Sequence, residues 1–433
     1  MMKNHPKFSS VCKPILFILI FWISACSGSK ATSDVLTPPE PTATATQAST
    51  PVPTPTSEVI QGTISIWHSL NEPAISSLVQ VIADFQTQYP DVQFDVLYLP
   101  ENIILERYRT AVQEGTGPTL LLGSDRWAPD IQQNGMAADL KARLSEELTN
   151  RINPAGLDAG LIGEEQIGLP YSLEGTVLYR NKELILDTPG TWDDLIAQSQ
   201  EITQGEEVGA FLDRGFYYSG GHLAGLGGTL INADGTPAFN SEEGLDWLEL
   251  LISYEKAGPT DFLTSADFER FKLGQVGYLI ENTTNREALK EAIGPLSLAI
   301  DPWPSYQDSK LAGYLVAQNV YLNEQAGDEN SRLGWLFAEY LLSPQAQLNL
   351  SKAGLIPAVL DAPVEDPLIA QVVTALAGNV VYPNSPQMEL YRTALDTALQ
   401  SVFSGASTPA DALAAAQASI EAALAGPTPT PTP

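Results

Sequence analysis

The side chains that most often perform chemistry are scarce in this chain of 433 residues. Its three histidines are His5, His68 and His222, and its two cysteines are Cys12 and Cys26. His68 and His222 lie far apart in the sequence, and His5 falls in an N-terminal segment that we expect to be removed. We therefore expect no metal site, no cofactor and no catalytic residue, since a catalytic triad would have to use one of these two histidines.

Carboxylates are the abundant reactive groups. The chain has 52 Asp and Glu residues against 22 Lys and Arg, and its formal net charge is −30. Such an acidic surface repels nucleic acid, which we exclude as a partner. Asp125 and Glu174 could form the carboxylate pair of a glycosidase, which requires a separation of about 5 Å or more. Nothing around them resembles a glycosidase signature, and we expect a protein that is not an enzyme.

The segments that would position these side chains alternate between two patterns. Strand-like sequence at 63–68, 92–99 and 119–122 alternates with helical spacing of apolar residues at 75–89 and 103–113. This βαβαβ order predicts an α/β fold with a parallel sheet covered by helices.

Beyond residue 168 the pattern is less regular. We predict the following elements: an extended stretch at 176–180, a helix from Thr191, an apolar helix at 242–256, a strand at 275–280, and mainly helices from 329 onward. Two α/β lobes follow from this order. Ligands of such sheets bind outside the carboxyl ends of the strands, so the gap between the lobes is the expected site.

The N-terminal segment indicates export. Residues 1–25 carry three lysines, no acidic residue and an apolar stretch too short for a membrane span, as in a signal peptide. The sequence ISAC, which ends at Cys26, resembles the lipobox of bacterial lipoproteins, in which the cysteine is acylated. We expect a protein anchored by its lipid to the outer face of the cell membrane. The alternative is an ordinary signal peptide followed by an incidental cysteine.

Proline and threonine dominate both ends of the remaining chain. Residues 26–58 read as a disordered tether, and residues 426–433 as a disordered tail. In polyproline conformation, about 3 Å per residue, the tether would reach roughly 90 Å from the membrane. The segment 59–425 between them contains no cysteine, so its stability must come from its core.

Several motifs, in their order and spacing, resemble the bacterial extracellular solute-binding proteins of the maltose/maltodextrin-binding type. They are ISIW at 64–67, GP at 117–118, LLLGSDR at 120–126, GLPYSLEGTVLYRNK at 168–182, TWDDL at 191–195, FKLGQVGY at 271–278 and PNSPQM at 383–388. The resemblance implies a two-lobed periplasmic-binding-protein fold whose hinged cleft closes on a di- or oligosaccharide. It also implies a monomer that delivers the sugar to the permease subunits of an ABC importer, which a cytoplasmic ATPase drives.

Both lobes are discontinuous in that family. By analogy, the N-lobe comprises residues 59–172 plus 317–358, and the C-lobe comprises residues 173–316 plus 359–425. The chain would cross between them near 171–175, 311–317 and 356–361.

The resemblance further implies which polar residues contact the sugar. Asp125 and Arg126 match an Asp-Arg pair, a combination that satisfies both the donors and the acceptors of a polyol. Asp125 could also cap the following helix, and the two roles are compatible. Glu174 falls on a sugar-binding glutamate of the family, and a structural hydrogen bond is the alternative. Asn71 and Glu72 replace an acidic and basic pair of the family.

Aromatic rings cover the C–H faces of sugars. Tyr217 aligns with a tyrosine that stacks on the ligand in the family, and Tyr218 and Trp127 are further candidates. The alternative for such rings is the edge of a hydrophobic core.

Three departures from the family concern the sugar itself. Leu122, Thr284 and Arg392 stand where maltodextrin binders have stacking tryptophans, so a long maltodextrin would lose much of its platform. Arg392 could instead bind an acidic or differently substituted sugar, or form an ion pair with Glu389 on a helix surface. Two other functions remain open: a tethered carbohydrate sensor or adhesin without transport, and a binder of a non-sugar solute.

Overall fold

The computed structural model describes residues 59–426. The expected signal peptide, the tether with Cys26, and the tail after residue 426 lie outside the described residues. Among the helices described, none is both long enough and apolar enough to cross a membrane.

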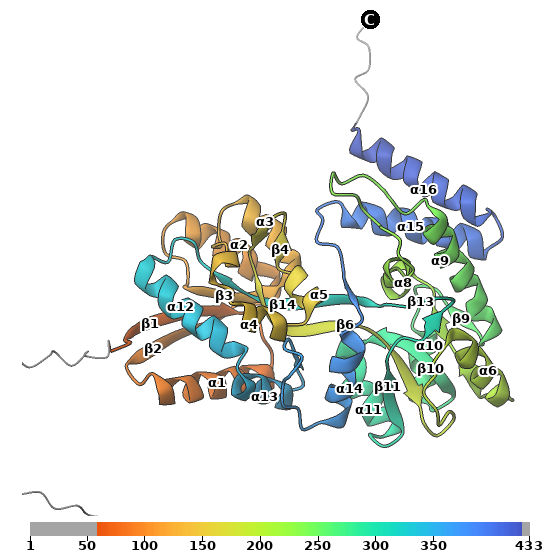
Figure 1. Cartoon of the computed structure of the whole chain (residues 1–433), viewed down its shortest axis with the longest axis horizontal. Coiled ribbons are helices and arrows are strands. Elements are labelled where there is room, and N and C mark those ends of the chain that lie inside the picture. The colour runs from red at the N-terminus through yellow and green to blue at the C-terminus, as the bar shows by residue number, and fades with distance from the viewer. Residues whose placement is uncertain (1–58, 427–433) are drawn as a thin grey trace, which may run out of the picture. The chain divides into compact units, whose positions relative to one another are not determined.

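The predicted βαβαβ unit is present. Strand β1 (Gly62–His68) pairs in parallel with β2 (Val92–Tyr98) and with β3 (Leu120–Ser124). Helices α1 (Ala74–Gln88) and α2 (Glu101–Gln113) connect the three strands (Figure 1). The parallel order places the carboxyl ends of all three strands at one edge of the sheet.

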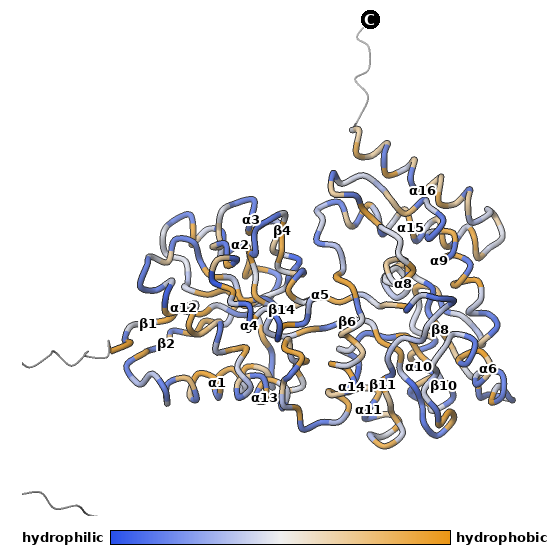
Figure 2. Tube along the Cα trace, in the orientation of Figure 1, coloured by the Kyte–Doolittle hydropathy of each residue, from blue (hydrophilic) through white to orange (hydrophobic). Residues whose placement is uncertain are grey.

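Helix α1 shows why the spacing of apolar residues in the sequence predicted a helix. Its buried residues include Leu78, Val81, Ile82 and Phe85, which recur at the spacing of one helical face. Figure 2 accordingly shows both hydrophobic and hydrophilic colours along α1.

Two further strands make the sheet mixed, so the expectation of a parallel sheet holds for its first three strands but not for the sheet as a whole. Strand β14 (Tyr314–Leu322) lies between β3 and β6 (Leu169–Asn181) and is antiparallel to both. The sequence analysis did not identify β14 as a strand. Most of its residues are buried, so it lacks the alternation that marks a strand with one solvent-exposed face.

Strand β6 pairs with four other strands along its 13 residues. Its first half pairs with β14 and with β15 (Ile356–Pro357), and its second half pairs with β10 (Val276–Asn282) and β11 (Leu298–Asp301). The three segments where we predicted crossings between lobes therefore lie side by side in one sheet. A Cβ atom on Gly175 would lie 2.5 Å from the carbonyl oxygen of Tyr314, so only glycine allows this close approach.

The second half of the fold also follows the predicted elements. Strand β7 (Val208–Ala210) pairs in parallel with β10. Helix α6 (Trp192–Ile202) begins with a capping box in which Thr191 and Asp194 each accept a hydrogen bond from the other's backbone N–H. Helix α9 (Glu242–Ser253) is followed by a short 3-10 helix, η3 (Tyr254–Lys256), over the predicted range.

The remaining elements are shorter or lie towards the C-terminus. The helices are α3 (Ala128–Gln133), α4 (Glu146–Arg151), α5 (Pro154–Asp158), α7 (Phe216–Ser219), α8 (Gly221–Gly225), α10 (Ala266–Lys272), α11 (Arg286–Ile293), α12 (Asp328–Leu341), α13 (Pro344–Lys352), α14 (Pro367–Leu376), α15 (Met388–Phe403) and α16 (Pro409–Leu424), with 3-10 helices η1 (Asp125–Trp127), η2 (Lys141–Arg143) and η4 (Thr283–Asn285). The strands are β4 (Leu161–Ile162), β5 (Glu165–Gln166), β8 (Leu212–Asp213), β9 (Thr260–Asp261), β12 (Ser305–Tyr306), β13 (Ser309–Lys310) and β16 (Val380–Val381).

A buried ion pair joins β6 to β11. The guanidinium of Arg180 donates from Nε and Nη2 to the two carboxylate oxygens of Asp301, at 2.6 and 3.0 Å. Both side chains are only 5% exposed, and the hydroxyl of Thr188 donates a further bond to Asp301 at 3.0 Å. The charges are thus paired and hydrogen-bonded, as burial requires.

Candidate functional site

A cavity of about 470 Å³ lies at the carboxyl ends of several strands. Its floor comes from β6 and β14, and its walls come from the segments that follow β1, β2 and β10. The polar residues that line it are Ser69, Asn71, Glu72, Glu101, Ser172, Glu174, Thr283, Thr284 and Gln318. This is the position that the α/β order predicted for a ligand.

The floor presents a row of hydrogen-bonding side chains. Ser172 and Glu174 are two residues apart in β6 and share one face of the strand, and Gln318 of β14 lies directly opposite Ser172. The amide of Gln318 donates to Glu174 Oε1 at 3.3 Å. Ser172 is only 1% exposed, and its hydroxyl has no hydrogen-bond partner among the described residues. The row therefore offers the half-buried carboxylate of Glu174 and amide of Gln318 to a ligand, whereas the hydroxyl of Ser172 is covered.

Glu174 shares its electrostatic environment with two charged neighbours. Burial raises the pKa of its carboxyl, and the charge of Glu101 raises it further. The hydrogen bond from Gln318 and the positive charge of Arg126 act in the opposite direction. Arg126 itself is exposed, so its guanidinium is available to a ligand.

Tyr217 lies close to the same groups. Its half-buried hydroxyl accepts a hydrogen bond of 2.7 Å from the amide of Asn282. Burial raises the pKa of Tyr217, while the bond from Asn282 and the charge of Arg126 lower it and the charge of Glu174 raises it. Arg126, Glu174 and Tyr217 are thus near enough for their charges to interact, although only Glu174 is among the residues that line the 470 Å³ cavity.

Tyr218 faces a different carboxylate. Its ring lies 5.3 Å from that of Tyr217, centroid to centroid, and its hydroxyl donates to Glu281 Oε1 at 3.3 Å. The side chain is half-buried. Tyr218 is therefore positioned to support the ring of Tyr217 from the side.

Asp125 is wholly buried, and its alternative role as a helix cap is wrong. Its Oδ2 accepts a hydrogen bond of 2.9 Å from the backbone N–H of Ala317, which ties β14 to the end of β3. The cap of η1 is instead Ser124, whose hydroxyl accepts a bond from the backbone N–H of Arg126 at 3.3 Å. Burial raises the pKa of Asp125 to about 6. The carboxylate does not line the cavity.

Trp127 and Leu122 lie away from the cavity lining. A Cβ atom on Gly123 would fall 1.8 Å from the ring of Trp127, so this ring covers the backbone of β3. Leu122 is 1% exposed and belongs to the main hydrophobic core, so it is not a lost stacking platform in the cavity. Thr284, by contrast, is exposed and lines the cavity wall.

Arg392 is engaged by two acidic residues of its own helix. Its guanidinium lies 2.5 Å from Glu389 and 3.3 Å from Asp396. The ion pair that was the alternative interpretation is therefore confirmed. Arg392 is absent from the lining of the 470 Å³ cavity.

Tyr382 was missed in the sequence analysis. It lines a second cavity of about 310 Å³ together with Arg126, and its ring centroid lies 5.9 Å from that of Tyr217. Tyr382 directly precedes the PNSPQM motif, which was the available signal. Glu101 was also missed, although it opens the helix that follows β2, where parallel sheets place their ligands.

Both described histidines have structural roles. His68 Nδ1 accepts a hydrogen bond from the backbone N–H of Leu70 at 3.2 Å, and His222 Nδ1 lies 2.6 Å from the carbonyl oxygen of Ala312. Burial lowers the pKa of His222 to about 4, so the ring is neutral and donates this bond. Neither histidine lines the 470 Å³ cavity.

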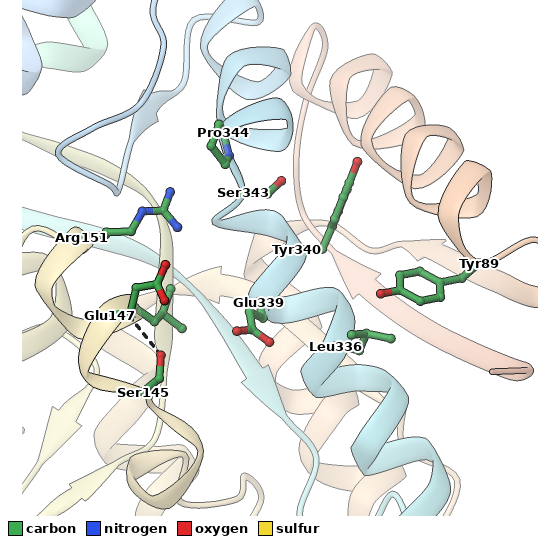
Figure 3. Close-up of a pocket in the computed structure, with 10 residues that line it drawn as sticks. Tyr89, Ser145, Glu147, Arg151, Leu336, Glu339, Tyr340, Ser343 and Pro344 are labelled. Carbon is green, nitrogen blue, oxygen red and sulfur yellow. Dashed lines mark hydrogen bonds between the residues drawn. The ribbon is translucent and has the colours of Figure 1, made fainter. Parts of the chain in front are cut away.

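A separate hollow of about 300 Å³ lies among α1, α4 and α12 (Figure 3). The side chains around it include Tyr89, Arg151 and Tyr340, but none of the residues predicted for the site. Arg151 is paired with Asp361 at 2.9 Å. None of the residues predicted for ligand binding therefore lines this hollow.

One group of carboxylates in the described chain has the spacing of metal ligands. Asp213, Asp261 and Asp267 are buried, and their oxygens lie within 4.8 Å of one another. Burial raises the pKa of Asp213 to about 7 and that of Asp267 to about 8, and the hydrogen bond to Asp261 adds to the latter shift. Asp267 is thus protonated at neutral pH and donates to Asp261. None of the three lines the 470 Å³ cavity.

This group predicts that stability falls as the pH rises. Between the unfolded pKa of Asp, about 3.9, and the folded pKa of about 8, the folded state holds the proton of Asp267 and the unfolded state does not. The free energy of unfolding should therefore decrease from pH 5 to pH 8, by at least about 1 kcal/mol. Urea unfolding at both pH values, with a chelator present, measures this change.

The variant Asp267→Asn should reduce this dependence, because the amide can donate to Asp261 at every pH, and the raised pKa values of Asp213 and Asp125 should leave part of the slope. The matched control Asp308→Asn replaces an exposed aspartate and should keep the slope of the wild type. An unchanged slope in Asp267→Asn would contradict the assignment of the proton.

Solved structures share this fold. An extracellular solute-binding protein from Staphylococcus aureus in complex with maltose superimposes with a TM-score of 0.75 and 19% sequence identity, over 84% of this chain and 99% of that one. The fold is therefore the two-lobed fold of periplasmic binding proteins, with a cleft between discontinuous lobes. Its class is that of the two-lobed α/β folds.

Sequence comparisons agree with this class. Residues 80–377 match the family model of the bacterial extracellular solute-binding proteins. The galactooligosaccharide-binding protein of Bacillus subtilis is 24% identical over 362 residues, 78% of this chain and 84% of that protein. A maltooligosaccharide ABC transporter solute-binding lipoprotein of Streptococcus pneumoniae is 26% identical over 275 residues, 58% of this chain and 64% of that protein. The chain belongs to the bacterial extracellular solute-binding protein family, whose members are binding proteins and not enzymes.

Proposed function

We propose that this protein is the substrate-binding component of an ABC importer and captures a di- or oligosaccharide. The cavity carries the proposal: its floor combines the carboxylate of Glu174 with the amide of Gln318, and Arg126 and Tyr217 are near enough to interact with that carboxylate. Such a set satisfies the donors and acceptors of sugar hydroxyls and covers a sugar face. The relatives named for oligosaccharide binding support the same ligand class.

In this proposal the lobes close on the ligand. The N-lobe comprises residues 59–172 and 317–358, and the C-lobe comprises 173–316 and 359–425. The pairing of β6 with β14 and β15 supports crossings at three neighbouring segments. The sugar favours closure because it contacts both lobes only in the closed state, and the permease binds that state.

The proposal extends to the location of the protein. Signal-peptide cleavage and acylation of Cys26 would anchor a monomer to the outer face of the membrane through the tether at 26–58. The lipobox-like sequence before Cys26 supports this, as does the lipoprotein from Streptococcus pneumoniae.

A thermal-shift screen of the purified protein against oligosaccharides tests the ligand class. A sugar that binds only the folded state should raise the melting temperature, and at a hundred times its Kd it should add about 2.7 kcal/mol of stability. If polyols or peptides shift the protein and no carbohydrate does, the sugar assignment fails.

Deletion of the gene tests the transport role. Uptake of the identified sugar should be lost and should return when the protein is supplied again. If this protein binds the sugar but uptake is unchanged after its gene is deleted, a tethered sensor or adhesin would be favoured.

A further inference from the structure

The 470 Å³ cavity has an unbalanced charge. Three carboxylates line it, those of Glu72, Glu101 and Glu174, and no lysine, arginine or histidine occurs among its lining residues. Carboxylates accept hydrogen bonds and attract positive charge, whereas a ligand carboxylate would meet charge of its own sign.

The cationic side chains near the 470 Å³ cavity are either paired with acidic residues or line a different cavity. Arg286 lies 2.9 Å from Glu287, and Lys290 lies 2.9 Å from Asp366. Arg126 lines the neighbouring cavity and not this one, although its charge reaches Glu174. The surplus of negative charge in the larger cavity therefore remains.

Two of the three carboxylates have unused acceptor capacity. Glu72 accepts hydrogen bonds from the hydroxyl and backbone N–H of Ser76, at 2.7 and 3.3 Å, so it is engaged at the start of α1. Glu101 is exposed and has no hydrogen-bond partner in residues 59–426, and Glu174 receives one bond of 3.3 Å from Gln318. Glu101 and Glu174 are close enough for their charges to interact.

We propose that Glu101 and Glu174 select ligands by charge, so that the cavity takes a neutral or amino-bearing sugar and rejects a carboxylate at the same position. The inference rests on the proposed function and adds to it the class of sugar and a specificity residue, Glu101. An ammonium group can donate to a glutamate carboxylate and offset its charge, whereas a hydroxyl can donate without offsetting it. The acidic sugar considered for Arg392 is thereby excluded from this cavity.

The test compares three ligands of one skeleton. Calorimetry at pH 7 and low salt would use maltotriose and two derivatives in which the CH2OH group of a terminal ring becomes CH2NH3+ or COO−. Each pair of derivatives is made at both terminal rings. The affinities at one end should follow the order ammonium, hydroxyl, carboxylate, with at least about a tenfold difference between the first and the last.

A charge-removing variant locates the selection. Glu101→Gln keeps the size of the side chain and should reduce the ratio of ammonium to carboxylate affinity by at least about threefold. The control Glu106→Gln lies on the same helix outside the cavity lining and should leave this ratio unchanged. Added salt should narrow the ratio in the wild type, because Glu101 is exposed to solvent.

The outcomes separate the two proposals. The inference is overturned if maltotriose binds but the charge of its derivatives does not change the affinity at either end. It is also overturned if the carboxylate derivative binds as tightly as maltotriose itself. In both cases the sugar assignment is unaffected. An unchanged ratio in Glu101→Gln would remove Glu101 as the specificity residue. If none of the ligands binds, maltotriose included, the inference loses its basis, while the sugar assignment is decided separately by the thermal-shift screen.

Discussion

Replacement of Asp301 by alanine should lower the free energy of unfolding by about 3–5 kcal/mol. The variant leaves Arg180, which is 5% exposed on its side chain, as an unpaired buried charge between β6 and β11. The guanidinium keeps only its bonds to the carbonyl oxygens of Ile185 and Leu186 and to the hydroxyl of Thr188. Urea unfolding followed by circular dichroism measures the loss.

Two controls separate burial from the mere loss of a charge. Glu269→Ala breaks an exposed pair with Lys272 of 3.2 Å and should cost less than about 1 kcal/mol. The double variant Arg180→Met with Asp301→Leu removes both charges and should recover much of the stability lost in Asp301→Ala. A loss below about 1 kcal/mol in Asp301→Ala would contradict the role assigned to the pair.

Replacement of Glu174 or Tyr217 by alanine should weaken sugar binding by at least about 1–3 kcal/mol, or roughly 5- to 150-fold in Kd. Loss of Glu174 leaves ligand hydroxyls without their acceptor on the floor of the cavity. Loss of Tyr217 removes the ring beside Arg126 and Glu174. Isothermal titration with the sugar that gives the largest thermal shift measures both effects.

Matched variants outside the cavity show whether these effects are local. Tyr98→Ala removes a tyrosine that is 47% exposed and whose ring lies 5.9 Å from that of His68, away from the Tyr217 and Arg126 group, so affinity should remain that of the wild type. Arg392→Ala should also leave the affinity for a neutral sugar unchanged, because Glu389 and Asp396 engage this side chain. Wild-type affinity in both Glu174→Ala and Tyr217→Ala would remove these residues from the site.

The sequence predicted elements by two different signals. Helix α1 and strand β1 have apolar residues at helical or strand spacing. Strand β3 is wholly buried and was identified instead as a short apolar run directly after Gly117 and Pro118. Strand β14 is buried along most of its length, and without polar alternation its sequence does not distinguish a strand from a buried helix.

The site was predicted less completely than the fold. Asp125 and Arg126 are adjacent in sequence, yet one is wholly buried and the other is exposed. The partner that holds Asp125 is the backbone of Ala317, 192 residues later, and no local pattern indicates such a contact. Glu174 was predicted from the resemblance to the family, but its place on the face of β6 that meets the cavity, beside Ser172, could not be read from the sequence.

The continuity of β6 limits how this protein can vary in length. Strand β6 pairs with β14 and β15 in its first half and with β10 and β11 in its second half. An inserted or deleted residue within Leu169–Asn181 would therefore turn every side chain beyond it to the opposite face. The change would move Glu174 or its neighbours out of the cavity, or move Arg180 away from Asp301, depending on where it occurred. Surface loops of either half can therefore change in length independently during evolution. The length of β6 cannot, because the alternation of its side chains must stay in register across both halves.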